Sequence, residues 1–244
     1  MSRLVTGLQP VREAIRVHGE RLERVLVEER GGPQIDAVAR FASDRGAAVV
    51  RVSRSELDRA SKGARHQGAI AYAPDLVLVA LDEVANSLAA DTVILALDEI
   101  EDPQNFGAVI RSAVALGAAA IVWPEHHAAP LSPATFRASA GAVEHARLCR
   151  VSALPSALDR LREAGATVIG LDANAEKDLR DVTGDGPFVL VVGAEGKGLR
   201  KPVKRACTEL ARLPMTGVLD SLNASVAGGI ALYELVRRRR TADR

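Results

Sequence analysis

The chain has 244 residues, of which 48% are apolar and 26% are charged, and its formal net charge is +1. This length excludes a miniprotein that needs disulfides or a metal for stability, and it allows one large domain or two small ones. The near-neutral charge and an aromatic content of 3% disfavour a strongly basic nucleic-acid binder and an aromatic platform for single strands.

The composition also disfavours metal, disulfide and membrane functions. Cys149 and Cys207 cannot form a disulfide framework, and the chain contains no CxxC pair. The histidines lack the spacing of metal ligands, and no apolar run reaches the roughly 18 residues of a membrane span. The first residues lack the long apolar segment of a signal peptide. We therefore expect a cytoplasmic protein with no metal, no disulfide and no membrane association.

The near-neutral total hides three zones of different charge. Residues 1–80 carry a net charge of +3, residues 81–185 carry −8 and residues 186–244 carry +6. Basic residues therefore gather toward the two ends of the chain. Such an asymmetry matters more for partner binding than the total does.

Helical and extended patterns alternate at the start of the chain. The expected elements are a helix over 10–18, a strand over 24–28, a helix over 35–42, a strand over 48–52, a helix opened by the capping box of Ser53 and Glu56, and a strand over 68–72. We expect residues 1–74 to form a small α/β domain and residues 75–91 to form a linker.

The alternation is stronger from residue 92 onward. The expected elements are strand 92–97, helix 105–116, strand 119–123, helix 158–164, strands 167–171, 188–192 and 210–213, and helix 224–240. Continuous apolar strands between helices indicate a parallel sheet covered on both faces. We expect residues 92–244 to form one α/β domain, in which ligands bind beyond the carboxyl ends of the strands.

The first candidate site follows strand 92–97. Asn105 can cap the next helix, and Arg111 lies in its second turn. Arg111 is either a solvated helix residue or, because its neighbours Ile110 and Ser112 are apolar and small, a partly buried cation that needs an anionic or dipolar partner.

The second candidate site is a glycine-rich segment directly after strand 188–192. Gly193, Gly196 and Gly198 permit a close approach of the backbone to a ligand, but they fit neither GxGxxG nor a P-loop. The segment is either a tight turn or a ligand site. Glu195 would repel a phosphate and suits a cationic or hydroxyl-bearing ligand better.

The third candidate site precedes the final helix. Ser221 and Asn223 are good N-caps for that helix, and its free N–H groups can alternatively bind a polar ligand. The run of arginines over 237–240 complements the negative end of the helix dipole. It is either a solvated helix end or a phosphate contact.

Together the three segments resemble the motifs of the SpoU (TrmH) family of SPOUT RNA methyltransferases. The first motif corresponds to residues 102–113, the second to 192–199, and the third to 213–217 followed by 221–227. Three motifs in order, each at a strand end, make the resemblance specific, and it covers residues 92–240.

Segments outside these motifs narrow the resemblance. Residues 64–71 resemble the end of the ribosomal-protein-L30-like substrate-binding domain of this family, and residues 139–144 also fit. The combination is most similar to members that methylate a guanosine of 23S ribosomal RNA. Leu213 and Ala224 depart from the residues usual in the family, but neither departure removes a functional side chain.

The resemblance implies a SPOUT α/β-knot, in which a C-terminal trefoil knot holds S-adenosylmethionine, preceded by a small L30-like domain. It implies methylation of a ribose 2′-hydroxyl in the peptidyl-transferase region of 23S ribosomal RNA, by a homodimer with active sites near the subunit interface. The residues matching the donor-binding positions are Gly193, Gly196, Leu213, Met215 and Leu222. The residues matching the catalytic positions are Asn105, Arg111, Glu195, Ser221 and Asn223.

The implied chemistry moves a methyl group from a sulfonium to a ribose oxygen by in-line displacement, so positioning supplies much of the rate. The family assigns activation of the hydroxyl to the arginine that corresponds to Arg111. Because an arginine stays protonated in proteins, we expect Arg111 to stabilise the developing alkoxide or to grip the adjacent phosphate. Glu195 can hold Arg111, balance the sulfonium or accept the proton.

Two other classes of protein compete with this interpretation. A Rossmann dehydrogenase should contain GxGxxG after its first strand and an acidic residue about 20 residues later, and the sequence contains neither. A non-catalytic RNA-binding module should have lost Arg111, Glu195 or Asn223. Within the enzyme class, relatives modify transfer RNA or other ribosomal RNA positions, including one that confers antibiotic resistance.

A basic stretch near the end of the N-terminal domain is either a solvated helix face or an RNA contact. It comprises Arg51, Arg54, Arg59, Lys62, Arg65 and His66. The scarcity of aromatic residues favours recognition of folded RNA by shape and backbone contacts, with one extruded nucleotide, over stacking along a single strand.

Overall fold

The computed structural model describes residues 2–184, 186–216 and 221–242. By its internal contacts the chain divides into two compact units. The first unit is Met1–Val77 with Leu131–His145, and the second is Leu78–Pro130 with Ala146–Arg244. Among the described residues, no helix is both long and apolar enough to span a membrane.

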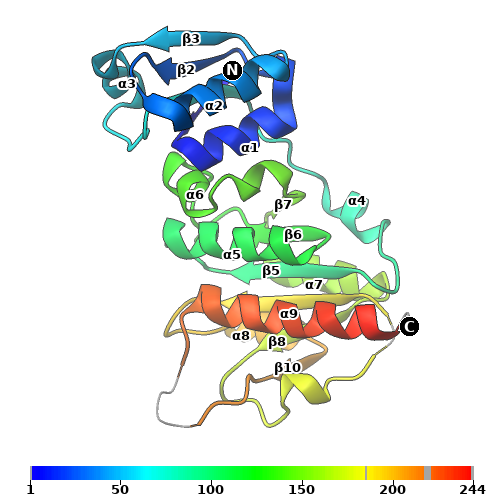
Figure 1. Cartoon of the computed structure of the whole chain (residues 1–244). Helices are drawn as coiled ribbons and strands as arrows, with labels where there is room; N and C mark the ends of the chain where they lie inside the picture. Colours follow the sequence, from blue (N-terminus) through cyan, green and yellow to red (C-terminus); the bar gives the residue numbers. More distant parts are fainter. Residues whose placement is uncertain (1, 185, 217–220, 243–244) are drawn as a thin grey trace. The chain divides into compact units, whose positions relative to one another are not determined.

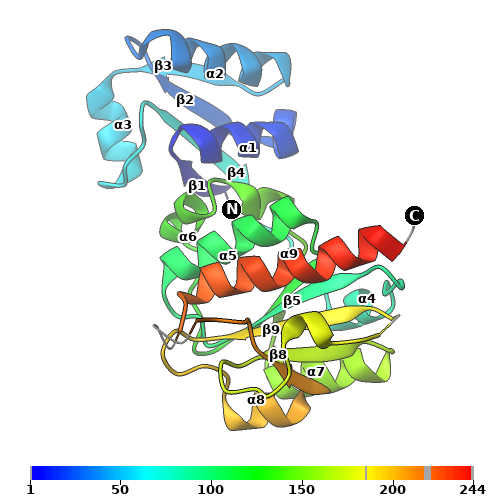
Figure 2. The ribbon, with the colours of Figure 1, turned by 60° about the horizontal axis from the view of Figure 1, so that its bottom comes forward.

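The first unit contains a four-stranded mixed sheet in the order β1-β4-β2-β3. Figure 1 labels β2 and β3 of this sheet, and Figure 2 labels all of its strands. The strand β4 pairs antiparallel with β1 and β2, and β2 pairs parallel with β3. Its strands are β1 (Ser2–Thr6), β2 (Arg24–Glu28), β3 (Val49–Val52) and β4 (Ala69–Pro74). Its helices are α1 (Leu8–His18), η1 (Gly19–Arg21), α2 (Gly32–Asp44), α3 (Arg54–Ser61), α6 (Pro133–Ala138) and η2 (Ala142–His145).

Local sequence signals account for several elements of the first unit. The predicted capping box is present at the start of α3, where the Ser53 backbone N–H donates to Glu56 Oε2 at 2.9 Å. Apolar residues of β2 and β4 pack with those of α1 and α2 in one core. The edge strand β1 was not predicted, because only Val5 and Thr6 of its residues are buried.

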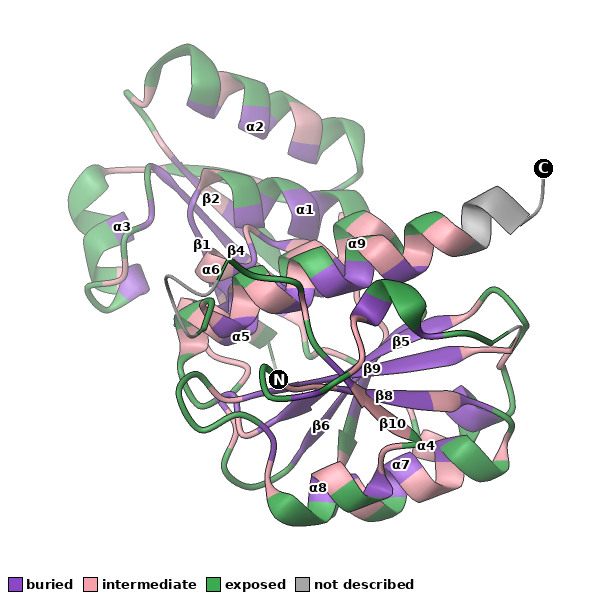
Figure 3. Ribbon diagram, turned by 90° about the horizontal axis from the view of Figure 1, so that it is seen from below, coloured by how far each residue is buried: buried purple, intermediate pink, exposed green. Residues whose placement is uncertain are grey.

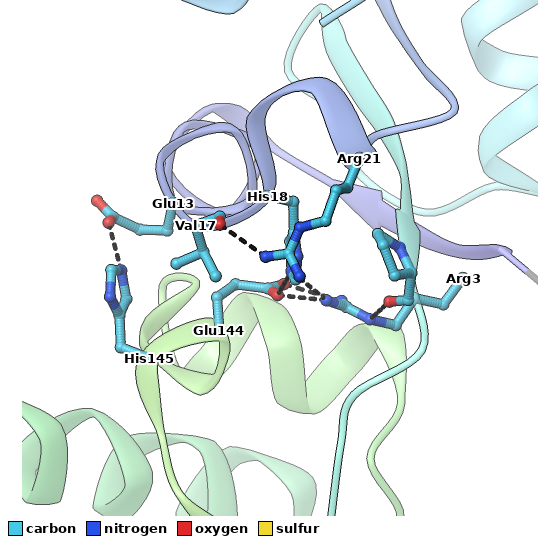
Figure 4. Close-up of polar contacts among 8 residues, drawn as sticks. Arg3, Glu13, Val17, His18, Arg21, Glu144 and His145 are labelled. Atoms are coloured by element: carbon cyan, nitrogen blue, oxygen red, sulfur yellow. Dashed lines mark hydrogen bonds and ion pairs between the residues drawn. The ribbon is translucent and has the colours of Figure 1, made fainter. Parts of the chain in front are cut away.

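Charged side chains hold η2 in the first unit (Figure 4). Glu144 is buried and accepts hydrogen bonds from Arg3, whose Nη1 lies 2.8 Å from Glu144 Oε1, and its Oε2 lies 2.9 Å from His18 Nε2. The neighbouring His145 Nε2 lies 2.9 Å from Glu13 Oε2. Burial alone would raise the pKa of the Glu144 carboxyl, but the hydrogen bonds from His18 and Arg3 hold it below its ordinary value.

The second unit contains a six-stranded parallel sheet in the order β10-β8-β9-β5-β6-β7. Its strands are β5 (Val93–Asp98), β6 (Ala120–Pro124), β7 (Leu148–Val151), β8 (Thr167–Leu171), β9 (Phe188–Gly193) and β10 (Glu209–Ala211). Its helices are α4 (Leu81–Ala85), α5 (Pro103–Leu116), α7 (Leu154–Glu163), η3 (Leu179–Asp181), α8 (Lys201–Ala206) and α9 (Ala224–Ala242).

Helices cover both faces of this sheet, as the apolar strands predicted. Figure 2 shows α5 and α9 side by side on one face, and α7 and α8 on the other. The central strands β5 and β9 are buried along their whole length (Figure 3). Because β5 and β9 run in parallel, the segments that follow them begin at the same edge of the sheet.

Candidate active site

Two of the sequence motifs begin at neighbouring strand ends. The strands β5 and β9 pair in parallel, and their last residues, Asp98 and Gly193, are partners in the register. The segment after β5 leads into α5, and the segment after β9 is the glycine-rich turn. The start of α9 packs in the same unit and brings the third motif to this edge.

A polar cluster joins one residue from each motif. Glu195 Oε2 accepts hydrogen bonds from Asn105 Nδ2 at 3.2 Å and from Asn223 Nδ2 at 3.1 Å. Asn223 Nδ2 also lies 2.8 Å from Asn105 Oδ1. The second carboxylate oxygen of Glu195 has no partner in the described part of the chain, so it can accept a hydrogen bond from a ligand.

The helix that carries Asn105 begins earlier than predicted, and Asn105 is not its cap. Asp102 caps α5, since its carboxylate accepts hydrogen bonds from the backbone N–H groups of Gln104 and Asn105. Pro103 occupies the first turn, where a missing N–H costs nothing. The Asn105 side chain is therefore free to contact Glu195.

The cap of α9 is Asn223 and not Ser221. Asn223 Oδ1 accepts hydrogen bonds from the backbone N–H of Ser225 at 2.9 Å and of Val226 at 3.4 Å. One amide group thus caps the helix with its oxygen and holds Glu195 with its nitrogen. Ser221 is exposed.

Arg111 does not join the cluster. It is exposed, and it makes no hydrogen bond or ion pair with the part of the chain that the structure describes, so the partly buried alternative is wrong. It lies six positions after Asn105, which corresponds to about 9 Å along α5 and about 120° around it. Arg111 is thus available to a group outside this chain.

A pocket of about 350 Å³ opens beside the cluster. All five predicted donor-binding residues line it, together with two of the predicted catalytic residues: Gly193, Gly196, Leu213, Met215, Leu222, Glu195 and Ser221. The pocket also contains Asp172 and Asn174, which follow β8, and Lys204 of α8. These three residues were not among the predicted site residues, although the rule that ligands bind at strand ends applies to Asp172 and Asn174 after β8.

The pocket suits S-adenosylmethionine in shape and charge. Gly196 has a φ of 74°, and a Cβ at this position would meet nothing within 4 Å, so the glycine leaves open space for a ligand. Gly193 is required for another reason, because a Cβ there would lie 2.3 Å from the backbone of Gly198. Apolar Leu171, Leu213 and Leu222 can cover an adenosine, and the Glu195 and Asp172 carboxylates can face a sulfonium or an ammonium.

Asp172 is held as a carboxylate. It forms an ion pair with Lys204 and accepts a hydrogen bond from the Asn174 backbone N–H at 2.9 Å. Burial would raise the pKa of Asp172, but these hydrogen bonds keep it below its ordinary value. The part of the pocket lined by Asp172 and Lys204 is therefore charged.

A second pocket, of about 320 Å³, shares the glycine-rich turn with the first. Glu195 and Lys197 line both pockets, and Asn105 lines only the second. Glu195 of the polar cluster therefore borders two hollows of similar volume. No group of three or more His, Cys, Asp or Glu residues that could hold a metal occurs among the described residues.

Part of the predicted basic stretch is exposed on the first unit. The exposed members are Arg51, Arg54, Arg59, Lys62 and Arg65. His66 is buried: its Nε2 lies 2.9 Å from Asp58 Oδ1, and its Nδ1 accepts the Gly68 backbone N–H at 3.0 Å. His66 therefore shapes the loop and is not itself a surface contact.

The exposed side of α9 carries an apolar stripe. Val226, Ile230 and Tyr233 are 48%, 47% and 54% exposed. A shallow hollow beside them is lined from α5 as well, by Ser112, Ala115 and Leu116. Farther along α9, Arg237 and Arg238 pair with Glu234, so these two members of the arginine run are engaged within the helix. The side chains of Arg239 and Arg240 lie outside the described residues.

Both parts of the sequence match known families. Residues 92–233 match the SpoU rRNA methylase family, and residues 4–76 match the family of RNA 2′-O ribose methyltransferase substrate-binding domains. YacO of Bacillus subtilis (strain 168), named as a TrmH family tRNA/rRNA methyltransferase, is 37% identical over 238 residues, which cover 96% of this chain and 95% of YacO. A protein of Mycolicibacterium vanbaalenii, named as an uncharacterized tRNA/rRNA methyltransferase, is 36% identical over 98% of this chain and 77% of its own length.

Solved structures similar to this chain are also RNA or SpoU methyltransferases. The SpoU methyltransferase AviRb from Streptomyces viridochromogenes aligns with a TM-score of 0.80 at 26% identity, over 99% of this chain and 91% of AviRb. An AdoMet-bound rRNA methyltransferase from Sinorhizobium meliloti aligns with a TM-score of 0.78 at 28% identity, over 97% of this chain and 87% of that protein.

The parallel sheet, the glycine-rich turn and the pocket at its edge define an S-adenosylmethionine-dependent RNA methyltransferase. The chain belongs to the SpoU (TrmH) family, as its three motifs predicted.

Proposed function

We propose that this enzyme methylates the ribose 2′-hydroxyl of a guanosine in the peptidyl-transferase region of 23S ribosomal RNA, in the cytoplasm. The observation that carries the proposal is the polar cluster of Asn105, Glu195 and Asn223 between the donor pocket and the second pocket. A hydroxyl in the second pocket would lie beside the free oxygen of Glu195.

The reaction requires a proton acceptor and a stable geometry. S-adenosylmethionine supplies an electrophilic methyl group when it is bound. The 2′-oxygen forms a bond to that methyl carbon as the carbon–sulfur bond breaks, the electron pair returns to sulfur, and the hydroxyl proton leaves. Glu195 is placed to take the proton or to balance the sulfonium, and the amides of Asn105 and Asn223 fix its carboxylate.

Arg111 is proposed to act on the RNA side of the reaction. Its guanidinium is exposed and unpaired within the described residues, so it can stabilise the developing alkoxide or grip the neighbouring phosphate. Ser221, at the rim of the donor pocket, completes the proposed catalytic set.

We also propose that two copies assemble through α5 and α9. The support is the stripe of Val226, Ile230 and Tyr233, which is an unusual amount of exposed apolar surface for a helix that faces only water. Arg111 lies one helical turn before Ala115, which lines the hollow at this surface, so the interface would place Arg111 at its rim. Light scattering should give the mass of a dimer, and a monomeric mass for the active enzyme would rule the interface out.

The domain assignment and the knot remain parts of this proposal. Residues 1–74 would select RNA through their exposed arginines and lysine. Residues 75–91 would link this domain to residues 92–244, which would carry out methyl transfer and contain a C-terminal trefoil knot. The support is the match of the family domains to residues 4–76 and 92–233, and the likeness to SpoU methyltransferase structures.

The test is methylation of isolated RNA with labelled S-adenosylmethionine, followed by mass spectrometry of the nucleosides. We expect label in 2′-O-methylguanosine from 23S ribosomal RNA. Label in another 2′-O-methylated nucleoside, or in transfer RNA, would support the alternative substrates. Label on a base would refute ribose methylation, and no label would favour a non-catalytic RNA-binding module.

A further inference from the structure

A buried carboxylate lies directly under the glycine-rich turn and belongs to none of the sequence motifs. Asp98, the last residue of β5, is fully buried. A buried charge is costly unless it is paired and hydrogen-bonded. Its partner is Arg200, which is 102 residues later in the chain and immediately follows the turn and Leu199.

Arg200 engages Asp98 with both its backbone and its side chain. The Arg200 backbone N–H donates to Asp98 Oδ2 at 2.9 Å, and Nε and Nη2 lie 2.8 Å and 2.7 Å from Asp98 Oδ1. The Asp98 hydrogen bond raises the pKa of Arg200. This pair therefore fixes the position of the main chain where the turn ends.

Glu99 adds a second carboxylate to the same arginine. Its Oε1 lies 3.3 Å from Arg200 Nη1. Glu99 has a φ of 56°, in the left-handed region that a residue with a Cβ seldom adopts. Such a backbone persists only where surrounding contacts impose it, and strain of this kind gathers at functional sites. Glu99 also lines the second pocket.

The glycine-rich turn between β9 and Arg200 is short, and a backbone hydrogen bond links its two sides. It begins at Gly193, the register partner of Asp98, and the Gly198 N–H donates to the Ala194 carbonyl at 2.8 Å. Asp98 thus contacts the chain at the start of the turn through the sheet and at its end through Arg200. Glu195 and Gly196, which line the donor pocket, lie between the two contacts.

The contact of Arg200 with Asp98 and Glu99 also fixes two segments beside the glycine-rich turn, namely α8 and the segment that leads to Asn105. Arg200 is the residue before α8, whose Lys204 pairs with Asp172, and both residues line the donor pocket. On the other side, Glu99 begins the segment that leads to Asn105. The 3.2 Å contact between Asn105 and Glu195 therefore joins two segments that are held together at their base by one arginine.

We propose that Asp98, Glu99 and Arg200 form a clamp that holds the glycine-rich turn in its donor-binding conformation, so that these three are positioning residues for methyl transfer. The clamp rests on the donor pocket of the proposed function for its ligand, but not on which RNA is methylated. None of the three lines the donor pocket.

The test uses the full-length protein and two readouts that need no RNA. In Asp98→Asn, the amides of residues 193–199 should exchange with deuterium about tenfold faster in the absence of donor. Calorimetry should show S-adenosylhomocysteine binding weakened by about 10- to 100-fold, because small misplacements of a binding group have effects of this size.

Two further variants separate positioning from folding. Arg200→Lys should recover part of the affinity lost in Arg200→Met, since lysine keeps the charge but not the forked geometry. Glu99→Gln removes a partly exposed contact, so it should fold normally and weaken donor binding by roughly threefold. As a control, Arg205→Gln removes an exposed cation from α8, the helix that follows Arg200. It should change neither the deuterium exchange nor the donor affinity.

Unchanged exchange and donor affinity within twofold of wild type in folded Asp98→Asn and Glu99→Gln would overturn the clamp. These results would be distinct from a failure of the proposed function, which would appear as methylation of the wrong nucleoside by the wild-type enzyme while the clamp variants still lost donor affinity.

Discussion

The charged side chains around Glu144 in the first unit are largely buried and paired with one another, whereas Arg111 and Glu195 of the predicted active site in the second unit are exposed. Glu144 in the first unit has no exposed side-chain surface and contacts Arg3 and His18. Arg111 and Glu195 in the second unit are exposed, and Glu195 keeps one carboxylate oxygen without a partner in the described chain. Buried, paired charges hold a fold together, and exposed, unpaired ones remain available to a substrate.

The largest effect should come from an exposed group. Arg111→Ala should lower the methylation rate by at least about 100-fold, because it removes the cation proposed to face the developing charge or the phosphate. Calorimetry with S-adenosylhomocysteine should change little, since Arg111 does not line the donor pocket. Arg150→Ala, which removes another exposed arginine of the second unit, is the control. A methylation rate near that of wild type in Arg111→Ala would show that Arg111 does not stabilise the transition state or hold the RNA for methyl transfer.

The buried carboxylate Glu144 should affect stability and not chemistry. Glu144→Gln leaves Arg3 without its carboxylate partner, which should reduce the free energy of unfolding by about 3–5 kcal/mol. Donor binding by the folded protein should be unchanged. Glu29→Gln, an exposed carboxylate of the same unit, should have an effect within about 0.5 kcal/mol. An equal loss of stability in both variants would contradict the comparison.

The same carboxylate predicts a dependence on pH. The pKa of Glu144 is lower in the folded protein than its ordinary value of 4.5, so its contribution is present above pH 4.5 and is lost as the pH falls through the folded pKa. Denaturation curves of wild type and Glu144→Gln should therefore converge below pH 4.5. A difference that stays constant into strong acid would show that Glu144 does not stabilise the fold as a carboxylate.

Asn223 has both kinds of role, because it caps a helix and contacts Glu195. Asn223→Ala should cost about 1 kcal/mol of stability from the lost cap and should also reduce the methylation rate. Asn223→Asp keeps a capping oxygen but replaces the amide donor with a charge that repels Glu195, so its stability should change less while the rate still falls. Equal rates in wild type and Asn223→Asp would show that the contact with Glu195 is dispensable.

The smallest effects should come from the exposed basic residues of the first unit. Lys62→Gln and Arg65→Gln should each weaken RNA binding and reduce the slope of log affinity against log salt by about 1. Arg40→Gln, on α2 of the same unit, is the matched control. Identical salt slopes in all three variants would place the RNA contacts elsewhere.

The parts of the fold that local patterns determine were predictable from the sequence. The strands β5 and β9 are almost entirely apolar, the glycine-rich turn directly follows β9, and Asn223 directly precedes the long helix α9. The sequence left the exposure of Arg111 open, because chain neighbours on a helix point about 100° apart and Ile110 can be buried beside an exposed arginine. Asp102 and Asn105 are both good caps, and Pro103 between them decides which one acts.

Contacts between residues far apart in sequence were not predictable. Arg3 meets Glu144 across 141 residues, and Asp98 meets Arg200 across 102. No local pattern signals either pair, because a charge in a strand or a turn appears the same whether its partner is water or a distant side chain.

We propose that Arg111 and the cluster around Glu195 serve the methylation of one ribose in 23S ribosomal RNA. The most direct test maps 2′-O-methylated nucleotides in ribosomal and transfer RNA from a strain that lacks the gene, complemented with wild type or with Arg111→Ala. We expect one 2′-O-methylguanosine of 23S ribosomal RNA to disappear on deletion and to return only with the wild-type gene. Loss of a transfer RNA modification with ribosomal RNA unchanged, or full restoration by Arg111→Ala, would contradict the account.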